Sequence, residues 1–237
     1  MQREYRKWKS PSLGRDMEIL IFGTGGTPVL IFPSDHGRFN EWEDQGVMGE
    51  VQEQIENGYN QFFCVDSVAY ESYFNKDVDP YVRLMRENQY QMYIMDEVLP
   101  FISEENANPY LISAGSGLGA YQALIFALKY PYSFNRLISM SGYYDINVHL
   151  DGFKDENSYY NNPIEFMPNL NDTALLKAIS SVDIRLISYL NDPNRDQTLK
   201  MSDILWMKYI EHQHSVLSEE TDNIWSLIPS TFKANLL

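Results

Sequence analysis

Apolar residues gather in short runs along the chain, and longer segments with helical periodicity lie between these runs. Most runs are apolar at nearly every position, as expected of parallel strands that helices cover on both faces. The runs span residues 15–22, 27–33, 61–68, 109–114, 136–140 and 183–190. The first two flank Gly-Thr-Gly-Gly at 23–26, which predicts an antiparallel hairpin. No helical pattern follows these glycines, so we expect a turn and not a phosphate loop.

The segments between the runs predict helices. Residues 118–129 are apolar nearly all round, which marks a central helix buried within the fold. The other predicted helices span residues 47–56, 81–101, 201–210 and 223–232. Strands that alternate with helices predict an α/β fold: a mostly parallel, doubly wound sheet with an N-terminal antiparallel hairpin and helices on both faces. No repeat or linker divides the chain, so we expect one domain over residues 1–237.

One segment departs from this alternation. Residues 147–172 are polar and aromatic and contain Asn-Asn-Pro and Met-Pro-Asn turns. We expect an excursion over the carboxyl ends of the strands, where sheets of this kind build their binding sites. An ordinary long loop is the alternative.

Charge and composition narrow the classes of function. The formal net charge of −15 argues against binding to nucleic acids, which needs basic residues to neutralise phosphates, and against docking on anionic membranes. No apolar run is long enough to span a bilayer, and the N-terminus lacks the apolar stretch of a secretory signal. The single cysteine, Cys64, excludes an internal disulfide and fits a reducing compartment. We therefore expect a cytoplasmic protein.

The most informative segment joins the run that ends at Ala114 to the central predicted helix. It reads Gly115-Ser116-Gly117-Leu118-Gly119. In α/β-hydrolases a Gly-x-Ser-x-Gly pattern forms a sharp strand-to-helix elbow that presents the nucleophilic serine above the sheet. Here the outer glycines are in place, and the central position holds Gly117.

The resemblance extends well beyond this motif. Gly-Leu-Gly-Ala-Tyr-Gln-Ala at 117–123, Phe-Ala-Leu-Lys-Tyr-Pro at 126–131 and Met-Ser-Gly-Tyr-Tyr-Asp at 140–145 resemble the putative esterase family related to esterase D. Residues 8–18, 37–44 and 65–68 resemble it too, and the match runs from about residue 5 to residue 225. Each piece alone is weak, but the set, in this order and at these spacings, is specific. The resemblance implies an α/β-hydrolase fold and carboxylic ester hydrolysis by a Ser–Asp–His triad.

Carried over position by position, that implied triad is incomplete. The nucleophile position is Gly117, and the acid position is Asp192, which follows the run at 183–190. The histidine of the family lies shortly before a final helix that contains tryptophan, but residues 218–225 contain no histidine. A single engineered change would have kept that histidine, whereas natural loss of the chemistry explains both absences. We therefore expect a pseudoenzyme that acts by binding.

The alternative is an ester hydrolase with a rearranged catalytic set. Its candidates are Ser116 or an activated water, with His36 and either Asp192 or Asp35. Ser116 stands one residue early, so its side chain should point away from the elbow residue. His36 lies in the loop that in this fold supplies one amide of the oxyanion hole.

The other candidate groups have simpler explanations. We interpret Ser113 as a packed residue inside a strand, His212 and His214 as residues at the edge of the last strand, and His149 as part of the polar excursion. Because no spacing typical of metal ligands is present, we predict no metal and no cofactor.

If the protein binds without catalysis, its site should use the surviving scaffold. The amide of Leu118 at a helix N-terminus, the loop amides near Gly37, and Arg38 beside them attract anions. They predict a small acyl or carboxylate ligand, or a protein partner; the oligomeric state stays open. We also predict a positive φ at Gly117, Asp192 at the end of a nearby strand, and no histidine nitrogen within hydrogen-bond reach of Asp192.

Overall fold

An eight-stranded sheet organises the computed structural model, which describes residues 1–219, 221 and 223–236. Its spatial order is β1-β2-β4-β3-β5-β6-β7-β8, and the six strands from β4 to β8 in this order run parallel. The strands are β1 (Arg3–Lys9), β2 (Asp16–Phe22), β3 (Thr27–Phe32), β4 (Asn60–Val65), β5 (Ile112–Ser116), β6 (Arg136–Met140), β7 (Asp183–Tyr189) and β8 (Gln213–Leu217). This architecture is the predicted α/β-hydrolase sheet, with an N-terminal antiparallel hairpin.

The hairpin, however, joins different strands from those that we predicted. β2 pairs with β1 on one side and with β4 on the other, so β4 lies between β2 and β3. The prediction missed β1 because this edge strand is mostly exposed and reads Arg-Glu-Tyr-Arg-Lys-Trp-Lys, without an apolar run. β3 is buried at nearly every position, which requires a place inside the sheet with neighbours on both sides.

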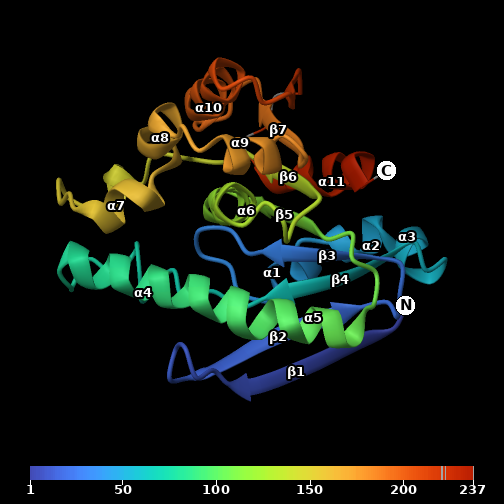
Figure 1. Cartoon of the computed structure of the whole chain (residues 1–237). Helices are drawn as coiled ribbons and strands as arrows, with labels where there is room; N and C mark the ends of the chain where they lie inside the picture. Colours follow the sequence, from blue (N-terminus) through green and yellow to red (C-terminus); the bar gives the residue numbers. More distant parts are fainter. Residues whose placement is uncertain (220, 222, 237) are drawn as a thin grey trace.

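Helices cover both faces of the sheet (Figure 1). One face carries the long helix formed by α4, a π-helical turn η1 and α5, together with α6, α9 and α10. The other carries α1, α2, α3 and α11. Their bounds are α1 (Glu41–Asp44), α2 (Val47–Glu50), α3 (Gln52–Glu56), α4 (Pro80–Tyr93), η1 (Ile94–Val98), α5 (Leu99–Glu105), α6 (Leu118–Lys129), α9 (Thr173–Ile179), α10 (Arg195–Met207) and α11 (Ile228–Leu236).

Alternate residues of each inner strand serve the two cores. In β3, Leu30 and Phe32 face the α6 side, and Val29 and Ile31 face the α11 side. This alternation follows from the two-residue period of a strand, and it explains why the runs are apolar throughout.

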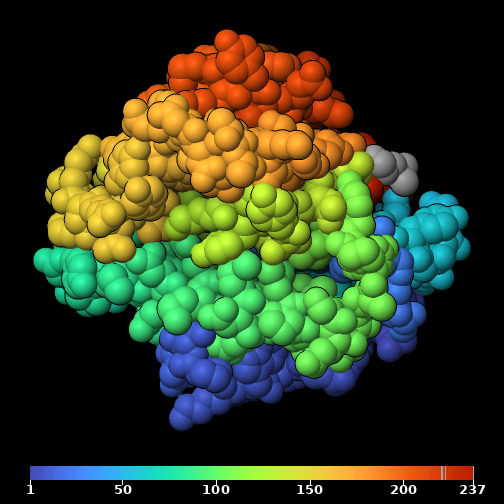
Figure 2. All heavy atoms as spheres, viewed as in Figure 1, coloured from blue at the N-terminus to red at the C-terminus, as the bar shows by residue number. Residues whose placement is uncertain are grey.

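The segment 147–172 folds into short helices beyond β6. They are η2 (Ile146–His149), α7 (Glu156–Asn161), α8 (Pro163–Phe166) and η3 (Met167–Asn169). Tyr121 of α6 donates its hydroxyl to the Asn161 carbonyl at 2.8 Å, and Gln91 of α4 donates to the Asn161 side chain. The segment therefore packs against α4 and α6, and Figure 2 shows its yellow surface directly beside the green one of α4.

Two features of the described chain bear on its surroundings. No helix in residues 1–219, 221 and 223–236 is long and apolar enough to cross a membrane. Cys64 is a free, buried thiol in β4.

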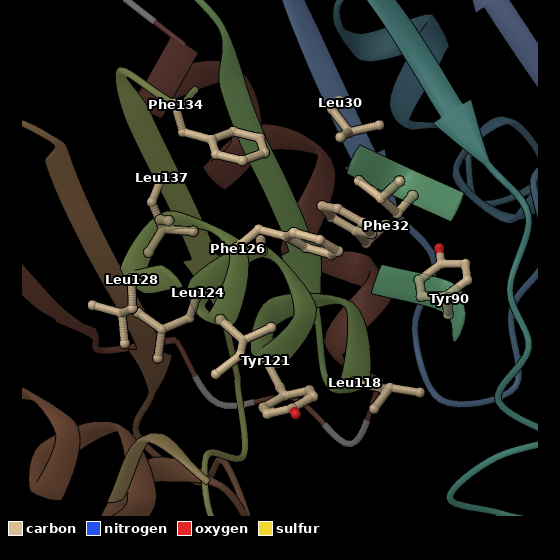
Figure 3. Close-up of a cluster of buried hydrophobic side chains, with 14 of the residues drawn as sticks. Leu30, Phe32, Tyr90, Leu118, Tyr121, Leu124, Phe126, Leu128, Phe134 and Leu137 are labelled. Atoms are coloured by element: carbon tan, nitrogen blue, oxygen red, sulfur yellow. The ribbon is translucent and has the colours of Figure 1, made fainter. Parts of the chain in front are cut away.

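Helix α6 anchors the larger core. Its side chains are almost all buried, and the ring of Phe126 stacks on that of Phe32 with centroids 5.3 Å apart (Figure 3). Leu124 and Leu128 lie on the other side of the helix, toward Leu137, so α6 is packed on more than one face. This packing holds the N-terminus of α6 against the end of β3.

We predict that Phe126→Ala lowers the free energy of unfolding by about 3–5 kcal/mol, because the lost ring leaves a cavity in a packed core. Urea unfolding followed by circular dichroism measures the change. Tyr132→Ala is the control, since that side chain is 84% exposed and its loss should cost less than about 0.5 kcal/mol. Equal costs for the two variants would contradict the anchoring role of α6.

Candidate functional site

The elbow between β5 and α6 has the geometry expected of an α/β-hydrolase. β5 ends at Ser116, α6 begins at Leu118, and Gly117 between them has φ 56° and ψ −118°. Glycine adopts this conformation without the steric cost that a side chain adds. A Cβ at Gly119 would collide with the Phe32 carbonyl, and one at Gly115 with the Gly119 backbone. The outer glycines thus allow strand and helix to approach closely.

A carboxylate fills the space where the elbow residue would carry its side chain. Asp35 Oδ1 accepts a hydrogen bond from the Leu118 amide at 2.7 Å. A Cβ built on Gly117 would lie 2.6 Å from the same oxygen. Asp35 thus occupies the helix N-terminal amide that, in an esterase, would stabilise the oxyanion. From the sequence we expected Asp35 only as an alternative to Asp192, with His36 and either Ser116 or an activated water, and not as a partner of the Leu118 amide. The one sequence feature that points to this contact is the glycine at the elbow position.

Asp192 lies three residues beyond the end of β7, as predicted, and hydrogen bonds from neighbouring residues fix its side chain. Its Oδ1 accepts hydrogen bonds from the Ser141 hydroxyl at 2.7 Å and from the Asn194 amide at 2.8 Å. Its Oδ2 is buried and has no hydrogen-bond partner among the described residues. Ser141 itself has φ 51°, an uncommon value for a residue with a side chain. Asp192 therefore retains one free acceptor.

These groups face one cavity of about 450 Å³. Its described lining includes the carboxylates of Asp35, Glu41 and Asp192, and Tyr189 and Trp225 contribute aromatic surface. Among the described residues that line it there is no lysine, no arginine and no member of segment 147–172. The prediction that this segment builds the binding site is therefore wrong for this cavity. The wall is made by the segments that follow β3, β6 and β7, and by residues around Trp225.

Glu41 shapes the loop at the end of β3. Its carboxylate accepts hydrogen bonds from the Ser34 amide at 2.7 Å and from the Ser34 hydroxyl. Burial raises the pKa of Glu41, although these hydrogen bonds oppose the rise. Gly37 is buried directly beneath this carboxylate, where a Cβ would collide with it. Gly37 therefore supports the loop, and it is not among the described residues that line the cavity.

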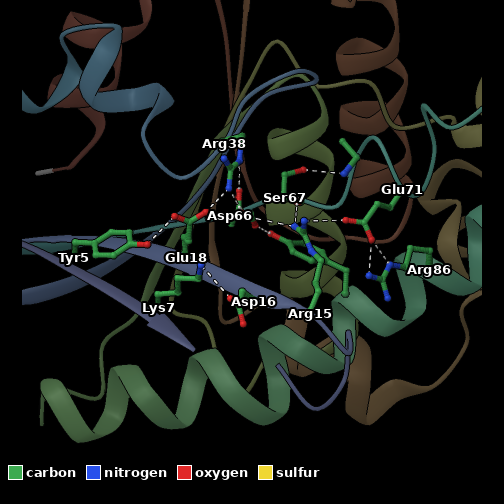
Figure 4. Close-up of polar contacts among 12 residues, drawn as sticks. Tyr5, Lys7, Arg15, Asp16, Glu18, Arg38, Asp66, Ser67, Glu71 and Arg86 are labelled. Carbon is green, nitrogen blue, oxygen red and sulfur yellow. Dashed lines mark hydrogen bonds and ion pairs between the residues drawn. The ribbon is translucent and has the colours of Figure 1, made fainter. Parts of the chain in front are cut away.

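Arg38 is not among the described residues that line the cavity, and it binds two carboxylates elsewhere (Figure 4). Its guanidinium donates to the buried carboxylate of Asp66 at 3.1 and 3.0 Å and also pairs with Glu18. Asp66 is the main reason why the pKa of Arg38 lies above its usual range. The expectation that Arg38 lies beside the elbow amides is thus corrected: its guanidinium binds Asp66, whose full burial the sequence does not reveal.

The four histidines are dispersed. His36 lines the cavity, but its Nδ1 contacts the Tyr70 hydroxyl at 2.9 Å. His212 contacts Ser202 and the Ile210 carbonyl, near β8. Burial lowers the pKa of His149 to about 4, and burial also lowers that of His214. In the part of the chain that the structure describes, no histidine is hydrogen-bonded to Asp192.

Ser116 is the remaining serine candidate. It is 3% exposed and contributes to the cavity wall, although we expected its side chain to point away from the elbow residue. No hydrogen bond within the described ranges joins Ser116, His36 and Asp192 to one another. Ser113, by contrast, lies inside β5 with its hydroxyl near the Ala123 and Arg136 carbonyls, as expected of a packed residue. The described residues also contain no cluster of side chains suited to a metal ion.

Comparison with known proteins shows the family of the chain. The sequence profile of a family described as putative esterase matches residues 10–215. The chain belongs to the putative esterase family. No curated protein sequence matches it.

Solved structures of esterases and related hydrolases are similar to it throughout. A ferulic acid esterase superposes with a TM-score of 0.80 at 13% identity, over 99% of this chain and 96% of the other. An S-formylglutathione hydrolase from Agrobacterium tumefaciens gives 0.76 at 11% identity, over 99% and 94%. A fluorophosphonate-binding serine hydrolase from Staphylococcus aureus, with substrate bound, gives 0.76 at 12% identity, over 99% and 96%. At these identities the likeness shows the fold, which is that of an esterase-like α/β-hydrolase.

We predict that Gly117→Ser and Asp35→Ala are coupled. Serine at the positive φ costs on the order of 1–2 kcal/mol of stability and also displaces the Asp35 carboxylate. Once the Asp35 carboxylate is removed, Gly117→Ser costs only the backbone strain. The double variant should therefore lose about 1 kcal/mol less stability than the sum of the two single variants. Urea unfolding of the four proteins measures this coupling.

Gly117→Ser combined with Glu104→Ala is the matched control for that cycle. Glu104 is an exposed carboxylate on α5, so this pair should be additive to within about 0.5 kcal/mol. Additivity in both pairs would show that Asp35 does not occupy the space above Gly117.

Proposed function

We propose that this member of the esterase family binds a ligand in the elbow cavity and forms no acyl-enzyme at position 117. The observation that carries the proposal is the Asp35 carboxylate on the Leu118 amide. Serine esterases need a nucleophile at the elbow and free amide donors for the oxyanion. Here the elbow residue is glycine, and the amide already holds an anion.

The same carboxylate opposes the chemistry electrostatically. An ester carbonyl placed at the elbow would develop negative charge beside Asp35, where like charges repel and the amide donor is already engaged. Asp192 orients no histidine base, because its Oδ1 accepts from Ser141 and Asn194 and its Oδ2 contacts no histidine in the described chain. These arguments favour binding without covalent turnover.

The cavity also favours a class of ligand that differs from the acyl or carboxylate ligand expected from the sequence. Asp35, Glu41 and Asp192 bring acceptors and negative charge, and the described lining contains no lysine or arginine to offset them; its one imidazole, His36, contacts the Tyr70 hydroxyl. An anionic ligand would be repelled, whereas ammonium or hydroxyl groups can donate to carboxylates of this wall. The aromatic rings of Tyr189 and Trp225 offer surface for an apolar or cationic body. We therefore infer a cationic or hydroxyl-bearing ligand.

Hydrolysis by a rearranged set is the second candidate, and the comparisons favour it over an inactive protein. The family model and the structural neighbours are those of esterases and hydrolases. Ser116, His36 and Asp192 line the same cavity. In this candidate, His36 would leave Tyr70 and take a proton from Ser116 or from a water molecule.

Labelling with a fluorophosphonate probe distinguishes the two candidates. We predict no labelling of the wild-type protein and no hydrolysis of p-nitrophenyl acetate above that of Ser116→Ala. Gly117→Ser should leave this rate unchanged, because a serine without a base is a weak nucleophile and the parts of a triad act as a unit. Labelling that disappears in Ser116→Ala, or a rate that Gly117→Ser raises, would establish the hydrolase candidate.

Calorimetric titration with benzylamine and benzyl alcohol tests the class of ligand. We predict that benzylamine binds at low salt and that Asp192→Asn weakens this binding on the order of tenfold, as expected when a charged acceptor is lost. Asp196→Asn is the control, because it makes the same change of net charge at an exposed position of α10. Equal benzylamine binding in both variants would contradict the inferred class.

A further inference from the structure

A second cavity, of about 490 Å³, lies on the α4 side of the sheet. Residues of α4 and η1 form one wall, α7 forms another, and the end of α6 forms the floor. None of its described lining residues also lines the elbow cavity. It therefore has its own chemistry, and it is independent of the proposed function.

The floor of this cavity carries a lysine whose contacts are neutral. Lys129 Nζ donates to the side-chain oxygens of Gln91 at 2.8 Å and of Asn161 at 3.1 Å. Within residues 1–219, 221 and 223–236, no carboxylate lies within ion-pair distance of this ammonium. Two of its three protons are thus engaged by amides, and the third is available to a group in the cavity.

The ammonium lies in a desolvated position. Burial lowers the pKa of Lys129 to about 8, and the charge of Glu87 opposes this shift. Glu87 does not pair with Lys129 directly, because its buried carboxylate accepts from Ser72 and Gln122. A largely protonated, desolvated ammonium without an anionic contact is stabilised when an anion binds beside it.

The amides around Lys129 are positioned before any ligand binds. Asn161 accepts from Gln91 and donates its own amide to Asn88 Oδ1 at 2.8 Å, and both Gln91 and Asn161 are almost fully buried. The Asn88 amide nitrogen has only long contacts, 3.5 Å to Asn157 Oδ1 and 4.0 Å to Met85 Sδ. It is therefore a second donor that a ligand can use.

The rim of the cavity contains apolar and aromatic groups as well as one acid. Met92, Tyr130 and Tyr160 line it, and Tyr160 is about half exposed. Met95 and Asp96 come from η1, a π-helical turn inside the long helix. Such turns are frequent at functional sites, since the extra residue weakens the helix.

We infer that this cavity is a second binding site, for a small carboxylate with an apolar or aromatic body. The carboxylate accepts from Lys129 and Asn88, and the tyrosines and Met92 contact the body of the ligand. A single ammonium with amide donors suits a monoanion; phosphate binding typically uses arginine forks or several backbone amides. The site thus prefers the opposite charge to the elbow cavity.

A calorimetric titration with benzoate at pH 7 tests the site. We predict saturable binding that Lys129→Met weakens on the order of tenfold or more, as expected for a charge-assisted hydrogen bond. Lys154→Met is the matched control, because Lys154 is an exposed lysine paired with Glu165. Asp96→Asn should strengthen benzoate binding, since it removes a negative charge from the rim without touching the buried network.

The pH dependence follows from the same lysine. Benzoate binding should be strongest below pH 8 and should fall as the pH rises through the pKa of Lys129, about 8, because the ammonium loses its proton. The inference is overturned if benzoate fails to saturate, if Lys129→Met and Lys154→Met bind it equally, or if inorganic phosphate displaces benzoate at lower concentration than acetate does. If Lys129→Met does not fold, unchanged binding in Asp96→Asn and a flat pH profile would overturn it equally.

Discussion

The hydrogen bond from the Leu118 amide to the Asp35 carboxylate determines what the elbow can do. Three features bring the partners together. The outer glycines let the N-terminus of α6 approach the end of β3, the loop after β3 carries Asp35, and Gly117 leaves the intervening space empty. A side chain at 117 and the Asp35 carboxylate in its present position exclude each other. Glycine at position 117 and the hydrogen bond between the Leu118 amide and Asp35 are therefore linked, because the missing side chain leaves room for the carboxylate.

The two cavities divide the polar chemistry of an acidic chain. The elbow cavity collects carboxylates and has no lysine or arginine in its described lining, whereas the second cavity places a desolvated lysine among amides. We propose that each cavity favours a ligand of opposite charge to its own. Helix α6, on which the larger core is built, connects the two cavities. Its first residue, Leu118, donates the elbow amide, and its last, Lys129, forms the floor of the second cavity. Movements of this one helix would therefore reach both cavities.

Much of the fold was predictable from the sequence, because apolar runs and the glycines of the elbow report burial and close backbone approach directly. The positive φ of Gly117 and the place of Asp192 after β7 follow from that pattern. β1 was missed because an exposed edge strand needs no apolar pattern. The direction of Arg38 was mispredicted because it depends on the buried Asp66. The contact of Asp35 was missed because it depends on how the loop after β3 folds over the N-terminus of α6. Long-range polar contacts of this kind leave no local periodicity.

The most direct test of the central claim is a pH titration by NMR of the Leu118 backbone amide and the Asp35 side-chain carboxyl carbon. A carboxylate that accepts from an amide shifts the amide resonance when it gains or loses its proton. Our account predicts that the Leu118 amide moves with the same midpoint as the Asp35 carboxyl and that Asp35→Asn abolishes this movement. A Leu118 amide that does not respond to the ionisation of Asp35 would contradict the account.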